Sequence, residues 1–387
     1  MFKFIYLLFI LLLAVGLIQA QSAFNLIGSG ARASGMGGAF TGLADDATAI
    51  SWNPAGLTQL QEMEASVVAR LGFGSASYDF PGDLGIDSWD VETQSNFQFN
   101  FGSFVVPFDV GDRKVVAGLA YRTVFDFNDY QKGTVESQFG TFEYVSENTG
   151  GIYAISPAVA VPITDNFSVG ATANIMSGSL ELTEESDGIV DFETAIDFSG
   201  FSVDLGVLFR ASDQFSAGAS FNLPHTITWE SEGEELDMKV PFFFSVGAAF
   251  KPSEVITVLF DYRGRSWSNT KFEVDGEEIE DFFEFENANS IHVGLEYLAS
   301  SGDSFIPIRL GYNTVPLLFT DANDDAITGH NITGGVGFIL GKLILDASIE
   351  YTILSYLDPD FTPIFGEDID FSQNSFRITI SGVIHLN

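Results

Sequence analysis

The chain contains no cysteine among its 387 residues. This absence excludes a disulfide framework, thiolate metal sites, iron–sulfur clusters, a cysteine nucleophile and a lipid-modified N-terminal cysteine. Basic residues are also scarce, because 16 Lys and Arg stand against 53 Asp and Glu, a formal charge of -37. Nucleic-acid binding needs clustered Lys and Arg that displace counterions from phosphates, so we expect no nucleic-acid partner.

Histidine is scarce as well, and its four positions are scattered: His225, His292, His330 and His385. No grouping of serine, histidine and acid can be assigned from these positions. We therefore expect no enzyme, no catalytic residue and no cofactor. Residues 321–325 resemble half of a calcium loop but lack the glycine at the sixth position and the glutamate at the twelfth. We expect a solvated acidic loop without a metal site; the alternative is loosely held divalent cations that bridge to anionic surface lipid.

What the chain has is apolar surface. Hydrophobic residues make up 46% of the sequence, with 39 Phe, 11 Tyr and 4 Trp, and glycine is abundant at 39 residues. This is far too much apolar surface for a disordered acidic chain. The acidic charge and the apolar content must therefore occupy different parts of one folded molecule.

The N-terminus predicts a secretory signal peptide. Lys3 is followed by an apolar run over residues 4–17, and Gln19-Ala20 precedes a polar stretch. This pattern predicts a signal peptide over residues 1–20 with cleavage after Ala20. A membrane anchor is the alternative, but the run falls short of the ~20 apolar residues that a spanning helix needs. No later stretch is long enough to span as a helix, so a mature chain that enters a membrane must do so as a closed barrel.

Alternation of apolar and polar residues recurs after residue 62. Phe97, Phe99 and Phe101 alternate with polar residues, as do the apolar residues of 201–209 and 376–380. The pattern predicts fourteen strands, at residues 62–72, 95–106, 114–126, 151–161, 166–179, 199–210, 214–229, 240–250, 254–269, 289–299, 305–315, 331–340, 342–354 and 374–386. One face of each strand is apolar, and the other is rich in Gly, Ser, Asn and Thr, which suits lipid outside and a lumen inside.

Short and long connections alternate strictly between these strands. Short turns on one rim, long loops on the other and an even strand number are typical of a single-chain outer-membrane barrel. We therefore predict an all-β fold, a 14-stranded antiparallel transmembrane β-barrel over residues 62–387; a soluble β-sandwich is the alternative. Of the 53 acidic residues, 37 fall in the seven long connections, beside only three basic ones. The strand core is therefore close to electroneutral, as a membrane-embedded band should be.

The segment before the barrel, residues 21–61, does not alternate and is dense in Gly and Ala. Small residues and tight turns permit close backbone approach, so this segment could pack in the lumen as a plug. Asp45 or Asp46 could cap one short helical turn before Trp52.

This segment also carries a family resemblance. Residues 30–40, 44–47 and 53–57, the last reading Asn-Pro-Ala-Gly-Leu, resemble the N-terminal hatch of the FadL-type outer-membrane transporters. Further similar stretches are residues 156–160, 166–171, 259–262, 266–268, 309–312 and 329–330. The resemblance runs the length of the mature chain and implies a fourteen-strand barrel with an N-terminal plug, or hatch, inside the lumen.

The resemblance implies a function as well. FadL-type proteins take up long-chain fatty acids and aromatic hydrocarbons passively and release them sideways through the barrel wall. We accordingly expect a monomer in the outer membrane of a diderm bacterium, in contact with membrane lipids and a hydrophobic small molecule, with its acidic loops facing outside. The hatch pattern is shared by barrels of type nine secretion, so the alternative function is the binding of secreted proteins.

Three groups of candidate functional residues follow. The hatch resemblance implies gating by Asn53, Pro54, Ala55, Gly35, Gly37 and Gly38; a plain turn is the alternative at residues 53–55. Arginines on the polar strand faces could hold a carboxylate bidentately, or could pair with Glu64, Asp204, Glu296, Asp346 or Glu350: Arg70, Arg122, Arg210, Arg309 and Arg377. Phe282, Phe283 and Phe285 could capture a hydrophobic ligand.

Pro157 lies mid-strand and predicts a bulge or a local gap in the wall.

Overall fold

The computed structural model describes residues 28–79, 88–94, 97–137, 140–186, 190–231, 233–279, 285–302, 304–358 and 369–386. The expected signal peptide over residues 1–20 lies outside this set. Within it, no helix is long and apolar enough to span a bilayer.

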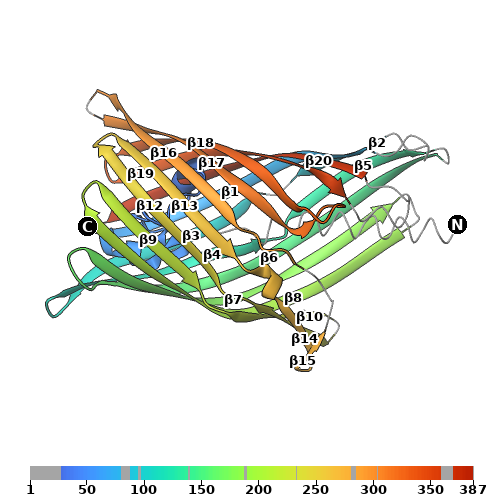
Figure 1. Ribbon diagram of the computed structural model, residues 1–387, viewed down its shortest axis with the longest axis horizontal. Helices are drawn as coiled ribbons and strands as arrows, with labels where there is room; N and C mark the ends of the chain where they lie inside the picture. Colours follow the sequence, from blue (N-terminus) through green and yellow to red (C-terminus); the bar gives the residue numbers. More distant parts are fainter. Residues whose placement is uncertain are drawn as a thin grey trace.

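The described chain forms one closed antiparallel sheet (Figure 1). The strands are β1 (Met63–Asp79), β2 (Ser88–Gln94), β3 (Gln98–Val110), β4 (Arg113–Asp126), β5 (Asp129–Ser137), β6 (Gly140–Pro162), β7 (Phe167–Ser186), β8 (Val190–Ser212), β9 (Phe215–Asn222), β10 (His225–Ser231), β11 (Glu234–Val240), β12 (Phe243–Ser253), β13 (Ile256–Arg265), β14 (Lys271–Val274), β15 (Glu277–Ile279), β16 (Ser290–Ser301), β17 (Ser304–Thr320), β18 (Ala326–Leu340), β19 (Leu343–Asp358) and β20 (Ile369–Leu386). The first and last strands pair continuously from Met63↔Leu386 to Asp79↔Asp370, which closes the barrel.

The predicted fourteen-strand barrel is confirmed. Its wall consists of β1, β3, β4, β6, β7, β8, β9, β12, β13, β16, β17, β18, β19 and β20. Closure leaves no edge strand in the wall, whereas a β-sandwich would have edge strands.

The predicted strand boundaries were wrong at the end where the long connections lie. β6 and β8 have 23 residues each, about twice the ~9–11 that cross a bilayer. Hairpin pairing continues past the apolar band, because the backbone hydrogen bonds of each ladder do not depend on lipid. Residues expected in loops therefore form β2, β5, β11, β14 and β15, and Pro224 separates β9 from β10. We call this the acidic end, and the opposite one the short-turn end.

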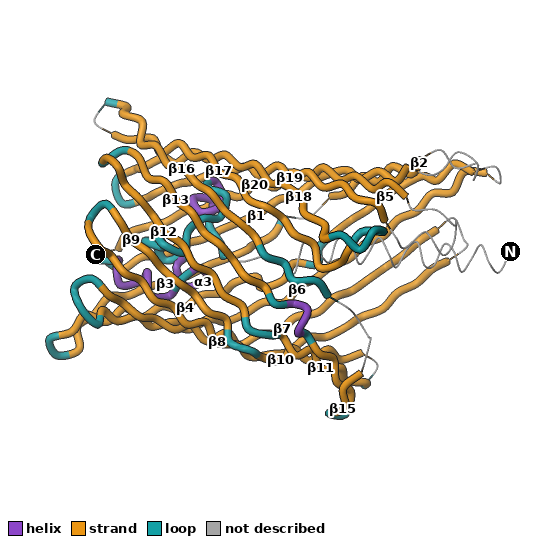
Figure 2. Tube along the Cα trace, in the orientation of Figure 1, coloured by secondary structure: helices purple, strands orange, loops and turns teal. Residues whose placement is uncertain are grey.

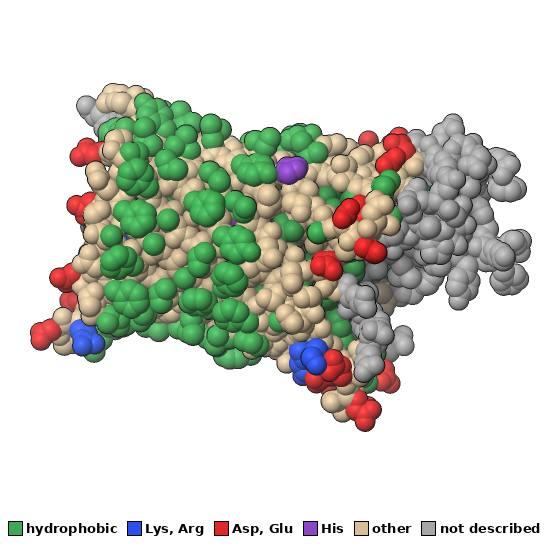
Figure 3. Space-filling model, in the orientation of Figure 1, with side chains coloured by type: hydrophobic (Ala, Val, Ile, Leu, Met, Phe, Trp, Pro, Cys, Tyr) green, Lys and Arg blue, Asp and Glu red, His purple; other side chains and the backbone are tan. Residues whose placement is uncertain are grey.

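The outer face of the wall is an apolar band (Figure 3). Large apolar side chains on it are half exposed, among them Ile175 at 58% and Phe201 at 54%. Stacked aromatic pairs lie on it toward the acidic end: Phe73–Phe376, Tyr351–Phe376, Phe99–Tyr121, Tyr121–Tyr153 and Tyr312–His330. A second set of exposed rings lies toward the short-turn end: Phe108, Phe209, Phe215, Phe250, Tyr297, Phe305 and Phe338. An apolar belt between two aromatic girdles is stable in lipid rather than in water.

One outward residue was assigned wrongly. Phe101 was expected on the lipid side with Phe97 and Phe99, but it is fully buried in the lumen. The register between β1 and β3 shifts at Val68 and Ala69, which leaves Asn100 as an extra residue. Because a bulge of one residue reverses the alternation, Phe101 turns inward.

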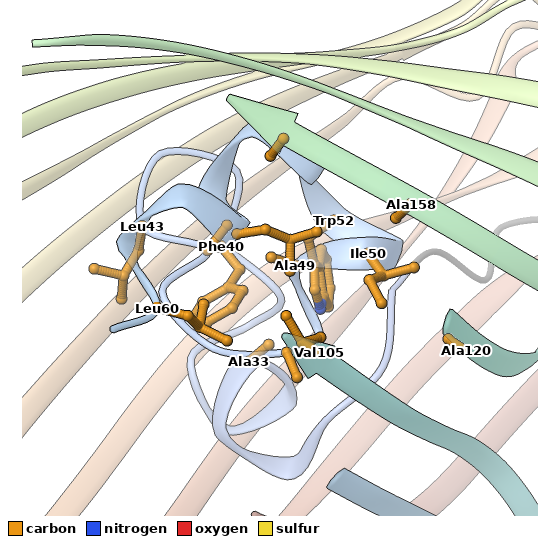
Figure 4. Packing of buried hydrophobic residues seen from close by; sticks show 14 of the residues in the cluster. Ala33, Phe40, Leu43, Ala49, Ile50, Trp52, Leu60, Val105, Ala120 and Ala158 are labelled. Carbon is orange, nitrogen blue, oxygen red and sulfur yellow. The ribbon is translucent and has the colours of Figure 1, made fainter. Parts of the chain in front are cut away.

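The hatch segment, which we define as residues 28–61, lies inside the barrel toward the short-turn end (Figure 2). It contains α2 (Ala31–Gly35), α3 (Ala49–Trp52) and the 3-10 helix η1 (Pro54–Gln59). Its apolar side chains Phe40, Ile50 and Trp52 pack in one buried cluster with Val105 of β3 and Ala120 of β4 (Figure 4). Asp46 Oδ1 accepts hydrogen bonds from Thr48 N and Oγ1 in the turn before α3.

Candidate functional site: the lumen and a gap in its wall

Glycines let the hatch backbone touch the wall directly. Gly37 and Gly38 have positive φ values of 65° and 71°. A Cβ on Gly37 would lie 2.8 Å from the backbone of Tyr312, and on the wall side a Cβ on Gly294 would lie 2.6 Å from Met36 O. The same holds for inward wall glycines on other strands: Gly170, Gly206, Gly218, Gly247 and Gly311. The glycine content of the strands is thus explained where the hatch docks.

Wall side chains also hold the hatch through its backbone groups. Asp261 Oδ2 accepts from Phe40 N at 2.9 Å and Thr41 N at 2.8 Å. Thr333 Oγ1 lies 3.0 Å from both Gly35 O and Gly37 N. The backbone groups of a turn would otherwise be buried without partners, so each contact offsets a desolvation penalty of ~1–3 kcal/mol.

The Asn-Pro-Ala turn is part of this docking. Asn53 is fully buried, and its Nδ2 donates to Thr41 O at 2.9 Å and to Val207 O of β8 at 3.0 Å. Its Oδ1 accepts from Ala55 N, with Pro54 in the first position of η1. Asn53 therefore caps η1 and also hydrogen-bonds the hatch to the wall.

A chain of ion pairs joins the hatch to three wall strands. Arg32 donates to Asp45 at 2.7 Å and to both oxygens of Glu296 at 3.1 Å. Arg309 donates to Glu296 at 2.7 Å and to Asp346 at 2.6 Å. Each buried charge thus has an opposite charge in contact, as burial requires. Burial raises the pKa of Asp46, beside this chain, against the lowering effect of Arg32.

A cavity of about 80 Å³ lies on the side of the hatch that faces the acidic end. Its hatch-side lining is Ile50, Ser51, Trp52 and Pro54. Its wall lining includes Arg122 and Val124 of β4, Asp204 of β8, Asn222 of β9 and Arg265 of β13. Hatch residues therefore form one side of the cavity, and polar and apolar groups share its walls.

The charges around the cavity do not balance. Arg122 Nη1 lies 3.6 Å from Asp204 Oδ2, but the two oxygens of Asp204 already accept from Asn174 and Asn222. Arg265 is 8% exposed, its guanidinium lies 4.9 Å from the ring centroid of Phe243, and within the described residues it forms no ion pair. Two guanidinium groups thus face one carboxylate, which leaves the cavity able to bind an anionic group.

An aromatic cluster adjoins the cavity toward the acidic end. Phe243 and Trp267 belong to both, with ring centroids 4.7 Å apart. The cluster continues through Phe198, Trp229, Phe272, Phe285 and Phe319. Phe285, expected to capture ligand, is one of its members, whereas Phe282 and Phe283 lie outside the described residues. A continuous aromatic cluster therefore extends from the cavity toward the acidic end.

The wall beside the cavity is not fully paired. β3 and β4 pair from Val110↔Arg113 to Phe101↔Arg122 and no further, although both strands continue. We call the unpaired facing residues 98–100 and 123–126 the wall gap. β3 bulges there at Asn100, and β4 bulges at Val124, where its register with β6 shifts. Bulges bend strands away from their partners, so two facing bulges hold the wall gap apart.

The wall gap concentrates polar atoms that lack partners. Gln98, Asn100 and Thr123 are 7%, 1% and 8% exposed. Both amide atoms of Gln98, Asn100 Oδ1 and Thr123 Oγ1 have no hydrogen-bond partner in the described part of the chain. Each such atom costs ~1–3 kcal/mol unless water or a ligand satisfies it.

The five predicted arginines lie on the lumen side but do not converge. Three of them form the expected pairs: Arg122 with Asp204, Arg309 with Glu296 and Asp346, and Arg377 with Glu350. Arg70 donates to Gly28 O of the hatch, and Arg210 lies near the short-turn end. Of the five, only Arg122 reaches the cavity.

The sequence prediction missed Arg32, Arg263 and Arg265. Arg263 donates to Gly38 O and lies over the Trp52 ring. The available signal was the alternation of Asp261, Arg263 and Arg265 on one face of a predicted strand.

Two further sequence features have structural outcomes. The ladder between β6 and β7 is interrupted between Ile155↔Ile175 and Ala158↔Thr172 without a shift of register. Pro157 therefore produces a local gap rather than a bulge, because it has no N–H to donate. Asp321 Oδ1 accepts from Asn323 N and Asp325 N in the turn between β17 and β18, and the described residues contain no group of three or more metal-ligating side chains.

Known proteins resemble this chain in structure rather than in sequence. The sequence matches no protein-family model and no curated protein. The Pseudomonas putida toluene transporter TodX superposes with a TM-score of 0.65 at 13% identity, and a Pseudomonas aeruginosa FadL homologue with 0.63 at 12%. The Ralstonia pickettii toluene transporter TbuX gives 0.60 at 15%. Each comparison covers 94% of this chain and 100% of the other. The chain therefore has the FadL-type fold.

Proposed function

We propose that this chain is a passive outer-membrane transporter of hydrophobic molecules, with the acidic end facing the outside. A ligand binds first to the aromatic cluster, then moves into the cavity and leaves sideways through the wall gap. The hatch blocks water and stays in place during passage. The proposal draws on the FadL-type fold, on similar proteins that are toluene transporters, and on the unpaired wall next to the cavity.

Arg265, which forms no ion pair within the described residues, carries the choice of ligand. A buried guanidinium without a counter-ion is destabilising by ~3–5 kcal/mol, which an anionic head group would offset. An engineered cavity that binds benzene measures about 150 Å³. The cavity of about 80 Å³ is therefore better suited to a carboxylate head than to a whole aromatic ring. We accordingly favour long-chain carboxylic acids over aromatic hydrocarbons, with the chain among the aromatic side chains.

The fixed hatch supports the sideways route. Its backbone touches inward glycines of several strands, and its Arg32 is bonded to Glu296 of the wall. Moving it out would break these contacts together. Passage through the wall gap breaks no ladder between β3 and β4, because residues 98–100 and 123–126 do not pair with each other.

Uptake into vesicles tests the proposal. Purified protein is placed in asymmetric liposomes with a lipopolysaccharide outer leaflet, which supplies the barrier that plain phospholipid lacks. We expect faster entry of a labelled long-chain fatty acid but no faster entry of small sugars. A chain that serves protein secretion instead would bind exported proteins and accelerate neither solute.

A further inference from the structure

We propose that Gln98, Asn100 and Thr123 are specificity-determining residues of the release step. They pass the polar head of an amphipathic ligand through the wall gap and so favour acids over hydrocarbons. This inference rests on the proposed lateral release and adds a second selection, separate from the one at Arg265.

The first support is the chemistry of the orphaned groups. Gln98, Asn100 and Thr123 are each more than nine-tenths buried, and the polar atoms named above have no partner within the described residues. Amides and hydroxyls can both donate and accept hydrogen bonds, so they can bind an ionised or a protonated carboxyl group. Because they carry no charge, they would not hold a carboxylate as strongly as a guanidinium does. Such groups therefore suit a head group that passes through the wall gap rather than one that stays bound there.

The second support is the position of these groups between cavity and lipid. Val124 and Phe125, which follow Thr123, line the cavity, and Arg122, which precedes it, also does. On the outer side Phe97 is 74% exposed and Phe99 is 48% exposed. A head group leaving Arg122 would therefore meet Thr123, Asn100 and Gln98 before it reaches lipid.

The third support is the depth of the wall gap in the membrane. Phe99 stacks on Tyr121 with centroids 5.6 Å apart, and Tyr121 stacks on Tyr153 at 5.8 Å. These rings belong to the aromatic girdle toward the acidic end, and girdles lie at the membrane interface. A head group that leaves there enters the polar layer of the bilayer while its chain enters the acyl layer. A hydrocarbon gains nothing from this depth and leaves the orphaned groups unsatisfied.

The test compares two ligands in the same vesicles. The double variant Gln98→Leu with Thr123→Val removes the polar atoms with little change of volume. We expect fatty-acid entry to slow about tenfold relative to toluene entry, which is about the size of one hydrogen bond to a charged group. Equilibrium binding of the fatty acid to detergent-solubilised protein should stay within about twofold of wild type, because Arg122 and Arg265 remain.

Matched variants separate this role from a general effect. Gln131→Leu makes the same change at another buried amide, on β5, and should leave the ratio of entry rates unchanged. Thr123→Ser keeps the hydroxyl and should retain most of the wild-type ratio. Heat-modifiable gel mobility confirms folding of each variant before its rates are compared.

The outcomes separate the two proposals. A wild-type protein that accelerates neither ligand overturns the proposed function. A wild type that is active, with a double variant whose ratio is unchanged or whose two rates fall equally, overturns the role of Gln98 and Thr123 alone. If the double variant loses affinity for the fatty acid together with its entry rate, these residues belong to the binding site in the cavity. That outcome also contradicts the proposal.

Discussion

Deletion of residues 28–61 is expected to turn the barrel into a water-filled pore. Phe40, Ile50 and Trp52 of the hatch and the backbone around Gly37 pack against the inner face of the fourteen-strand wall. Eight strands leave room only for side chains, whereas wider barrels leave an aqueous channel once nothing fills them. Liposome swelling in small sugars should therefore rise by an order of magnitude or more over the intact protein.

A second, milder variant tests the same seal in case the full deletion prevents the barrel from folding. Gly206→Val places a side chain where Asn53 Oδ1 now lies, which pushes the hatch turn away while the wall sequence stays otherwise intact. We expect a smaller but measurable increase in swelling. Gly334→Ala on β18, where a Cβ would lie 3.8 Å from its nearest neighbour, Arg309 O, is the control and should not leak. Swelling at the intact level after the full deletion would mean that the hatch does not seal the lumen.

Replacing Arg265 by Met is expected to cost the protein most of its affinity for carboxylate ligands. A hydrogen bond to a charged group is worth ~1.5–3 kcal/mol, so affinity for a long-chain fatty acid should fall about 10- to 150-fold. Affinity for the alcohol of the same chain length should change little, because it carries no charge for the guanidinium to bind. Displacement of a fluorescent fatty acid by each ligand measures both.

Arg210→Met is the matched control for this change. Arg210 also faces the lumen, but it lies opposite Ser216 in the ladder between β8 and β9, near the short-turn end, and does not line the cavity. It should leave both affinities unchanged. If Arg265→Met weakens the acid and the alcohol equally, or neither, Arg265 does not bind the head group, and the preference for acids is withdrawn.

Alternation along the strands was enough to predict the barrel. Phe201 to Phe209 keep period two over about a whole membrane crossing and Phe376 to Ile380 over about half of one, so one face must meet lipid and the other the lumen. Short and long connections then fixed which ends share a rim. Strand ends at the acidic end could not be predicted, because residues such as Glu181 and Thr183 read as polar loop but pair in the ladder between β7 and β8.

The site was predicted less well, for a physical reason. A bulge depends on how two strands pair, and the pairing cannot be read from the sequence. The bulge at Asn100 and the inward position of Phe101 could therefore not be predicted. The expected wall defect at Pro157 does occur, but the longer unpaired stretch lies between β3 and β4, where no proline marks it. Arg265 had no local signal that separated it from arginines with partners, because its isolation is a property of the packed lumen.

Cross-linking of the wall gap tests the account most directly. The chain has no cysteine, so Asn100→Cys with Thr123→Cys introduces the only thiols, and a short thiol-cleavable cross-linker can bridge β3 to β4. The control pair is Ser103→Cys with Ala120→Cys, on the same strands where the ladder is already continuous. The account predicts that bridging the wall gap stops fatty-acid entry while binding persists, and that cleavage restores entry to the rate of the same variant before cross-linking. The control pair should transport in both states. Undiminished entry with the wall gap fully bridged would contradict lateral release.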